Sequence, residues 1–197
     1  MLNIGVLICG GGTNLQAIID ETKSGGINGT VKLVISNKED AYGLERARLS
    51  KIKAVYETDE DKIIELLKEN NIDLIVLAGY LKIITPKFVD EFRNKIINIH
   101  PSLIPSFCGK GYYGEKVHQG VIDYGAKVTG ATVHFVDEGA DTGTIIMQEA
   151  VNVEQDDDAK SLAKRVLEVE HRILKESIRL FCENKLSIQG RRVFINE

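Results

Sequence analysis

The sequence predicts an α/β fold in which one domain, residues 1–197, contains a doubly wound, mostly parallel, Rossmann-like sheet with antiparallel strands added in its C-terminal part. The first observation is the alternation of short apolar runs with segments of helix length, which is typical of βαβ units. The second is the run "LIVLAG" at residues 74–79, which is apolar throughout, as in a central parallel strand that is covered on both faces. The third is a pair of strand-like runs late in the chain, at residues 127–136 and 144–153.

The elements follow in a regular order along the chain. Strands are expected at residues 4–9, 31–36, 53–56, 74–79, 96–99, 127–136 and 144–153. Helices are expected at about residues 14–23 and 43–50, and a third carries the apolar residues Ile63, Ile64, Leu66 and Leu67. A short helix is expected at Pro86, whose ring suits a first helical turn, and a long amphipathic helix at about residues 159–184. The right-handed crossover rule makes the sheet doubly wound. The glycine-rich stretch 106–116 predicts a mobile loop, and residues 186–196 predict a hairpin that turns at Gly190 and Arg191.

The composition is that of a soluble globular protein. The chain has 197 residues, of which 43% are hydrophobic and 27% charged, and its net charge of −4 argues against general affinity for nucleic acid or for an anionic membrane. The three cysteines, Cys9, Cys108 and Cys182, form neither a metal motif nor a disulfide framework, so a reducing cytoplasmic compartment and no metal are expected. The N-terminal apolar run has no cleavage site and is far too short to span a bilayer.

A glycine turn, "CGGGTN" at residues 9–14, lies between the first strand and the first helix. Backbone N–H groups in such a turn and the dipole of the following helix favour a bound anion, and Thr13 or Asn14 offers a side-chain donor. The turn is neither a dinucleotide fingerprint, because Leu15 stands where a third glycine or alanine is needed, nor a P-loop. The turn therefore indicates a phosphate site, with a tight turn that binds nothing as the alternative.

The strand at residues 96–99 ends in "NIHP", with Asn98 and His100 two positions apart. Side chains alternate along a strand, so both point to the same side, at the carboxyl end of a parallel strand, where open α/β sheets bind their ligands. Pro101 lacks an N–H group and ends the pairing. An amide and an imidazole placed there suit stabilisation of an oxyanion and proton transfer. The alternative is that neighbouring backbone groups satisfy both side chains.

The loop in "HFVDEGADTG", residues 134–143, supplies three carboxylates, Asp137, Glu138 and Asp141. A carboxylate near His100 would orient its ring and raise its pKa, but the residues alone do not choose among the three acids. His134 alternates with Thr132 and Val136 and is interpreted as a packed or supporting residue. His118 is expected on a surface helix, and no histidine belongs to a metal cluster.

Several stretches together resemble the folate-dependent formyltransferases. The signature stretches of that superfamily are similar to "NIHPSLIP" and "HFVDEGADTG". Three more stretches narrow the resemblance to the phosphoribosylglycinamide formyltransferases of purine biosynthesis: "LICGGGTNLQAIID", "SNKEDAYGLERA" and "LAGYLKIITPKFV". The resemblance covers nearly the whole chain and weakens after about residue 185.

The resemblance implies transfer of a formyl group from the co-substrate 10-formyltetrahydrofolate to the amine of glycinamide ribonucleotide, without a metal. From the charge, neither nucleic acid nor membrane is expected as a partner, and the sequence does not decide between a monomer and a homodimer. The resemblance also implies that Asn98, His100 and Asp141 are catalytic. The residues implied for the ribonucleotide are Gly12, Thr13, Asn14 and Glu170, and those for the folate are Leu81, Lys82, Ile83, Ile84, Asn98, Asp137, Glu138, Gly139, Ala140 and Asp141.

Alternatives stay open beside this interpretation. A methionyl-tRNA formyltransferase usually has a further C-terminal domain and a basic surface, and a formyltetrahydrofolate deformylase has an N-terminal regulatory domain, whereas this chain is short and acidic. A non-catalytic module that binds folate or a sugar phosphate is the third alternative. The sequence assigns no residue to the glutamyl tail of the folate and no role to Cys108 or His118, and it leaves Arg191 and Arg192 as surface charges.

Overall fold

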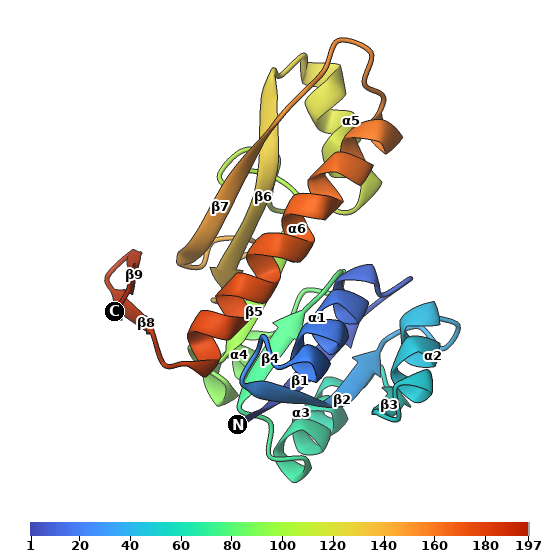
Figure 1. Ribbon diagram of the computed structural model, residues 1–197, viewed down its shortest axis with the longest axis vertical. Coiled ribbons are helices and arrows are strands. Elements are labelled where there is room, and N and C mark those ends of the chain that lie inside the picture. Colours follow the sequence, from blue (N-terminus) through green and yellow to red (C-terminus); the bar gives the residue numbers. More distant parts are fainter. Residues whose placement is uncertain (197) are drawn as a thin grey trace.

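The computed structural model describes residues 1–196 and has an α/β fold with one large sheet and a separate hairpin (Figure 1). Glu197, the last residue of the expected domain, lies outside the described residues. The strands are β1 (Leu2–Ile8), β2 (Gly29–Ser36), β3 (Lys53–Tyr56), β4 (Leu74–Leu77), β5 (Ile96–His100), β6 (Val128–Phe135), β7 (Ile145–Asn152), β8 (Leu186–Gln189) and β9 (Arg192–Ile195). The helices are α1 (Thr13–Ser24), α2 (Tyr42–Leu49), α3 (Glu60–Glu69), α4 (Pro86–Glu91), α5 (Glu115–Tyr124) and α6 (Ala159–Cys182).

The sheet confirms the predicted mixture of parallel and antiparallel strands. Its order is β3-β2-β1-β4-β5-β6-β7, with parallel pairing from β3 to β5 and antiparallel pairing of β6 with β5 and with β7. Helices cover both faces, because α1, α2, α5 and α6 bury apolar residues in one core cluster and α3 and α4 in the other. The fold is therefore doubly wound, as the sequence predicts. Among the helices described in residues 1–196, none has the length and the apolar character needed to cross a membrane.

The turn between β1 and α1 depends on glycine. Gly12 has φ of 71° and is the N-cap residue of α1, and a Cβ atom there would lie 2.8 Å from the Cα of Gly43. Gly43, in the first turn of α2, donates its N–H to the carbonyl oxygen of Gly10 at 3.0 Å. A larger residue at Gly12 would be strained both in its backbone and against α2. The glycine turn thus brings the first two βα units together and places the N-terminus of α1 at the carboxyl edge of the sheet.

The segment that follows β5 differs in part from the expectation. The sequence predicts a loop over residues 106–116, whereas α5 already begins at Glu115. The preceding turns are held by contacts: the ring of Phe107 packs edge-on against Tyr112 and Tyr124, and the N–H of Tyr112 donates to the carbonyl oxygen of Gly109 at 3.1 Å. The buried face of α5 includes His118, which is only 4% exposed, so the expected surface position of this histidine is wrong.

The C-terminal hairpin forms where the sequence predicts it. β8 and β9 pair as antiparallel strands with Gly190 at the turn, and the hairpin lies beside β7 (Figure 1). Arg191 is more than the surface charge expected of it, because its Nη1 atom donates to the carbonyl oxygen of Thr142 at 2.8 Å. The hairpin therefore touches the loop between β6 and β7.

Candidate functional site

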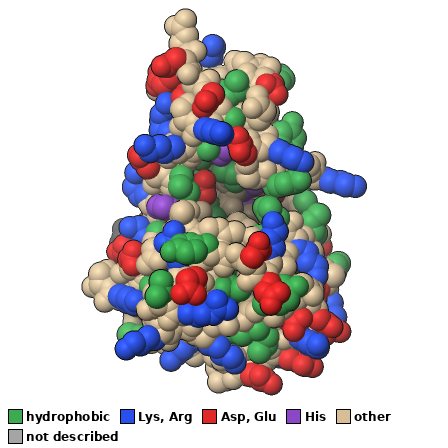
Figure 2. Space-filling model, turned by 90° about the vertical axis from the view of Figure 1, so that its right-hand side faces the viewer, with side chains coloured by type: hydrophobic (Ala, Val, Ile, Leu, Met, Phe, Trp, Pro, Cys, Tyr) green, Lys and Arg blue, Asp and Glu red, His purple; other side chains and the backbone are tan. Residues whose placement is uncertain are grey.

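A large pocket opens at the carboxyl ends of β4 and β5, where an open α/β sheet binds its ligands. Its volume is about 750 Å³, and a hollow crosses the middle of the face seen in Figure 2. The wall is built by the stretch 79–84, the end of β5, the stretch 109–115, the loop after β6 and one face of α6. The pocket thus receives residues from the end of the glycine turn, from the "NIHP" stretch and from the loop after β6.

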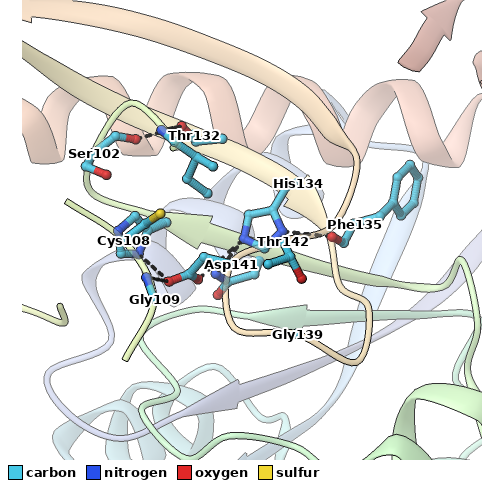
Figure 3. A network of polar contacts seen from close by, with 12 residues as sticks. Ser102, Cys108, Gly109, Thr132, His134, Phe135, Gly139, Asp141 and Thr142 are labelled. Atoms are coloured by element: carbon cyan, nitrogen blue, oxygen red, sulfur yellow. Dashed lines mark hydrogen bonds and ion pairs between the residues drawn. The ribbon is translucent and has the colours of Figure 1, made fainter. Parts of the chain in front are cut away.

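The three residues expected to be catalytic line this pocket. Figure 3 shows one of them, Asp141, beside His134. Asn98 and His100 come from β5 and share one side of it, as predicted from their spacing. Asp141 comes from the loop between β6 and β7, and its Oδ2 atom lies 3.6 Å from Nδ1 of His100. Of the three acids left open by sequence reasoning, Asp141 is the one that the structure places beside His100.

His134 links the members of this group. It is opposite Asn98 in the antiparallel pairing of β5 with β6, and its Nε2 atom lies 3.1 Å from Nδ2 of Asn98 and 3.7 Å from Oδ1 of Asp141. Its Nδ1 atom must donate to the carbonyl oxygen of Phe135, 2.7 Å away, because a carbonyl oxygen can only accept. In the neutral ring Nε2 is then an acceptor, so Asn98 donates one amide hydrogen to it and keeps the second for the pocket.

The ring of His100 has acceptors on both sides. Nε2 donates to the carbonyl oxygen of Phe107 at 2.9 Å, so in the neutral ring Nδ1, on the side of Asp141, carries the lone pair. Burial lowers the pKa of His100 below its ordinary value, although the charge of Asp141 and the Phe107 carbonyl both act to raise it. This corrects the expectation of a net increase: the carboxylate orients the ring, but desolvation outweighs its effect, because taking an imidazolium out of water is unfavourable.

Asp141 is held as a carboxylate. Burial opposes its ionisation, but the nearby imidazole of His134, the charge of His100 and the N–H of Gly109 together keep its pKa below the ordinary value. The Gly109 N–H donates to Oδ2 at 2.8 Å, which ties the stretch after β5 to the loop after β6. Asp141 has φ of 57°, in the left-handed region that few residues other than glycine occupy, although aspartate tolerates it better than most.

The expected ribonucleotide residues are only partly in the pocket. Nδ2 of Asn14 donates to Oε2 of Glu170 at 2.9 Å, so that α1 and α6 meet at this pair, and both side chains line the pocket. Burial raises the pKa of Glu170, and the Asn14 hydrogen bond lowers it in part. The Oδ1 atom of Asn14 is buried without a hydrogen-bond partner among the described residues. Gly12 and Thr13 lie in the turn before this pair and are not pocket-lining residues.

The expected folate residues form two sides of the pocket. All four residues of the stretch 81–84 line it, and Leu81 and Ile83 expose 49% and 65% of their surface, which is unusual for large apolar side chains. Most of the stretch 137–141 lines it as well. Glu138 is the exception, because its carboxylate forms an ion pair with Arg93 instead of facing the pocket.

Sequence reasoning missed two features of the wall. His118 faces the pocket from α5, and burial lowers its pKa to about 4. Lys160 and Lys164 line the pocket from α6 and have neither an ion pair nor a side-chain hydrogen bond among the described residues. The signal for the lysines was present: with Leu167 and Glu170 they follow a spacing of four, three and three, which places them on one face of a helix. Within residues 1–196 no three His, Cys, Asp or Glu side chains gather as a metal site.

Comparisons with known proteins agree on the family. The model of the family described as formyl transferase matches residues 2–178. The chain is 42% identical over its whole length to phosphoribosylglycinamide formyltransferase of Haemophilus influenzae, of which it covers 94%. It is 40% identical over 93% of its length to the chloroplastic phosphoribosylglycinamide formyltransferase of Arabidopsis thaliana, but spans only 66% of that relative. The crystal structure of glycinamide ribonucleotide transformylase 1 from Symbiobacterium toebii superposes with a TM-score of 0.94 at 45% identity, covering 100% of this chain and 95% of that one. This chain therefore belongs to the formyl transferase family.

Proposed function

We propose that this protein transfers the formyl group of 10-formyltetrahydrofolate to the amine of glycinamide ribonucleotide, which gives formylglycinamide ribonucleotide and tetrahydrofolate in purine biosynthesis. The observation that carries the proposal is one pocket that holds Asn98, His100 and Asp141 together with the Asn14–Glu170 pair. Relatives of similar length carry the name of this activity. All these residues come from one chain, so the proposal holds for a monomer and for a homodimer alike.

The ribonucleotide occupies the side of the pocket between α1 and α6. Its phosphate lies at the N-terminus of α1, by the backbone of Gly12, Thr13 and Asn14, where the helix dipole favours negative charge. The unpaired Lys160 and Lys164 supply positive charge on the facing wall. Glu170 is buried beside Asn14 and accepts from the ribose hydroxyls. The amine then points toward β5.

The folate occupies the other side. Its flat ring lies on the apolar stretch Leu81–Ile84 and against the loop 137–141, where exposed apolar side chains and backbone groups meet. Burial of Leu81 and Ile83 under a bound ring explains why two large apolar side chains stay exposed in the free protein. Glu138 has its own partner in Arg93 and contributes only through its place in the loop.

Formyl transfer requires stabilisation of an oxyanion on the formyl group and transfer of one proton from the amine to the folate nitrogen. The amine nitrogen attacks the formyl carbon, so a new C–N bond forms and the formyl oxygen becomes an oxyanion. The free hydrogen of the Asn98 amide donates to that oxygen. The amine loses a proton to Nδ1 of His100, and the imidazolium that results is stabilised by Asp141, 3.6 Å away. The folate nitrogen gains the proton through water as its bond to carbon breaks.

The lowered pKa of His100 favours proton transfer over donation to the oxyanion as the role of its ring. A histidine that is already protonated would donate to the oxyanion, whereas a ring that is neutral at pH 7 accepts a proton from the amine. Asp141 then compensates for the charge only after the proton has arrived. His100 is accordingly proposed as the general base and Asn98 as the principal oxyanion donor.

The test is a spectrophotometric assay. The purified protein is mixed with a 10-formyl folate, and the deformylated folate is followed with and without glycinamide ribonucleotide, with Asn98→Ala as the control for contaminating activity. Release that depends on the ribonucleotide and on Asn98 supports the proposal. Release without the ribonucleotide indicates a hydrolase such as a formyltetrahydrofolate deformylase, and no release from folded protein leaves a binding module; either result overturns it.

A further inference from the structure

The loop that brings Asp141 to the site has little regular structure of its own. It connects β6 to β7 and is closed internally by Asp137, whose carboxylate accepts from the N–H of Gly139 at 3.1 Å and from the hydroxyl of Thr142. These bonds fix the shape of the loop, but they do not fix its distance from β5. The position of Asp141 relative to His100 therefore depends on contacts that reach the loop from other elements.

Besides the hydrogen bond from the N–H of Val136 to the carbonyl oxygen of Ile96, 3.0 Å long at the start of the loop, and the contacts of Asp141 with His100 and His134, three such contacts exist among the described residues. Arg93, after α4, forms an ion pair with Glu138, and the N–H of Gly109 donates to Asp141 itself. The third contact is the hydrogen bond from Nη1 of Arg191 to the carbonyl oxygen of Thr142, at 2.8 Å, on the residue that directly follows Asp141. Arg191 lies beyond residue 178, where the match to the family model ends.

The hairpin that carries Arg191 is fixed to the body of the protein. Its residues Leu186, Ile188 and Val193 pack against the larger core cluster, and β9 contacts β7 (Figure 1). Gly190 adopts φ of 60° at the turn, which places Arg191 at the tip of the hairpin. The adjacent arginine is directed differently, because the guanidinium of Arg192 lies over the ring of Phe194, 4.9 Å from its centroid. Two neighbouring arginines of the same charge thus have different contacts.

We propose that Arg191 is a positioning residue for formyl transfer: its hydrogen bond to Thr142 holds the loop so that Asp141 stays beside His100 and His134. This inference rests on the proposed function. The bond is charge-assisted, which makes it stronger than a bond between neutral groups. The contacts that it protects are long, 3.6 Å from Asp141 to His100 and 3.7 Å to His134, so a small movement of the loop removes them.

The kinetic test compares the two neighbouring arginines. Arg191→Ala lowers kcat by about three- to tenfold, because misplacing a catalytic group by a fraction of an ångström weakens its contribution to the transition state. The KM for the ribonucleotide changes little, since Asn14 and Glu170 lie on other elements. Arg191→Lys, which keeps a charged donor, recovers part of the loss, and Arg192→Ala serves as the matched control with the kcat of the wild type.

A second readout does not depend on catalysis. The titration of the His100 ring is followed by NMR, with Asp141, His134 and His118 as the titratable groups whose charges act on it. Loss of Arg191 moves Asp141 away from His100, so the pKa of His100 falls further in Arg191→Ala and stays unchanged in Arg192→Ala. A merely stabilising hairpin would leave this titration unchanged in both variants.

The outcomes separate cleanly. A lowered kcat together with a lowered His100 pKa in Arg191→Ala alone supports the inference. An Arg191→Ala protein that matches the wild type in both readouts overturns it. Equal losses of kcat in both variants that follow the folded fraction, with an unchanged titration, also overturn it. If the wild type transfers no formyl group, the proposed function fails, while the titration still decides whether Arg191 positions Asp141.

Discussion

Asn98 and His100 reach the site on a strand, whereas Asp141 reaches it on a loop, and the two regions are built differently. β5 pairs with β4 on one side and β6 on the other, so hydrogen bonds to both neighbours set its register. The loop after β6 is placed by a few side-chain contacts and contains a left-handed residue at Asp141 itself. The core of the fold therefore positions the amide and the imidazole, while surface contacts position the carboxylate.

β5 and the loop after β6 also differ in how strongly the burial of apolar side chains secures their positions. A shift of β5 by one residue would turn the buried Ile97 and Ile99 to the opposite side of the sheet, so the positions of Asn98 and His100 are secured by the same burial that stabilises the fold. The loop has no comparable apolar contribution. Substitutions in the strand should therefore affect catalysis through chemistry, and substitutions around the loop through geometry.

The largest effect is expected from Asn98→Ala. Loss of an oxyanion donor lowers kcat by about 10²–10³-fold. The measurement is steady-state formyl transfer, with Asn152→Ala, an exposed position on β7, as the matched control. A variant that retains more than a tenth of the wild-type kcat would show that the amide of Asn98 does not carry the oxyanion.

A smaller loss, about tenfold in kcat, is expected from His134→Phe, because the amide of Asn98 loses the acceptor that orients it. His134→Gln keeps an acceptor and should restore part of the rate. Thermal unfolding of both variants shows whether the loss follows stability. Equal kcat values for the two variants, both well below the wild type, would mean that the acceptor plays no part.

The ribonucleotide side of the pocket should respond in KM. The double variant Lys160→Gln with Lys164→Gln raises the KM for the ribonucleotide by about tenfold and leaves kcat and the folate KM nearly unchanged, because charge-assisted bonds to phosphate are lost. As a control, Lys32→Gln, at an exposed position on β2, removes one positive charge away from the pocket. A rise in the folate KM instead would place the glutamyl tail, and not the phosphate, at these lysines.

The smallest effect concerns stability and pH. The pKa of His100 is lowered in the folded state, and that of His118 is lowered to about 4, so the unfolded chain binds more protons as pH falls below about 6.5. The contribution of these two neutral rings to the free energy of unfolding is therefore fully present above that pH. It is lost toward pH 4, by at most about 1.4 kcal/mol per pH unit for each histidine. Urea unfolding from pH 7 to 4 measures the slope. The slope of the unfolding free energy against pH should be shallower in His118→Gln. An unchanged slope would show that the titration of His118 does not contribute to the pH dependence.

Much of the fold follows from local patterns in the sequence. The continuous apolar run at β4, the alternation in β6 and the amphipathic character of α6 each depend on residues close in the chain, and the structure has all three elements. The hairpin turn at Gly190 is equally local. The beginning of α5 at Glu115 was missed, because the glycines before it conceal where helical spacing starts.

The site was predictable where it depends on strand geometry. The shared side of Asn98 and His100 follows from alternation alone. The choice of Asp141, the contact of His134 with Asn98 and the burial of His118 depend on which elements pack together, and composition and spacing do not contain that information. The lowered pKa of His100 has the same origin, since the net direction follows from the balance between burial and one nearby carboxylate.

The measurement that tests the account most directly is a double-mutant cycle across the two regions. Formyl transfer is measured for the wild type, His100→Ala, Asp141→Ala and the double variant, each with its folded fraction. If strand and loop act as one catalytic unit, the double variant loses no more kcat than the more severe single variant. Losses in kcat that multiply would contradict the account, because they would show that His100 and Asp141 act independently.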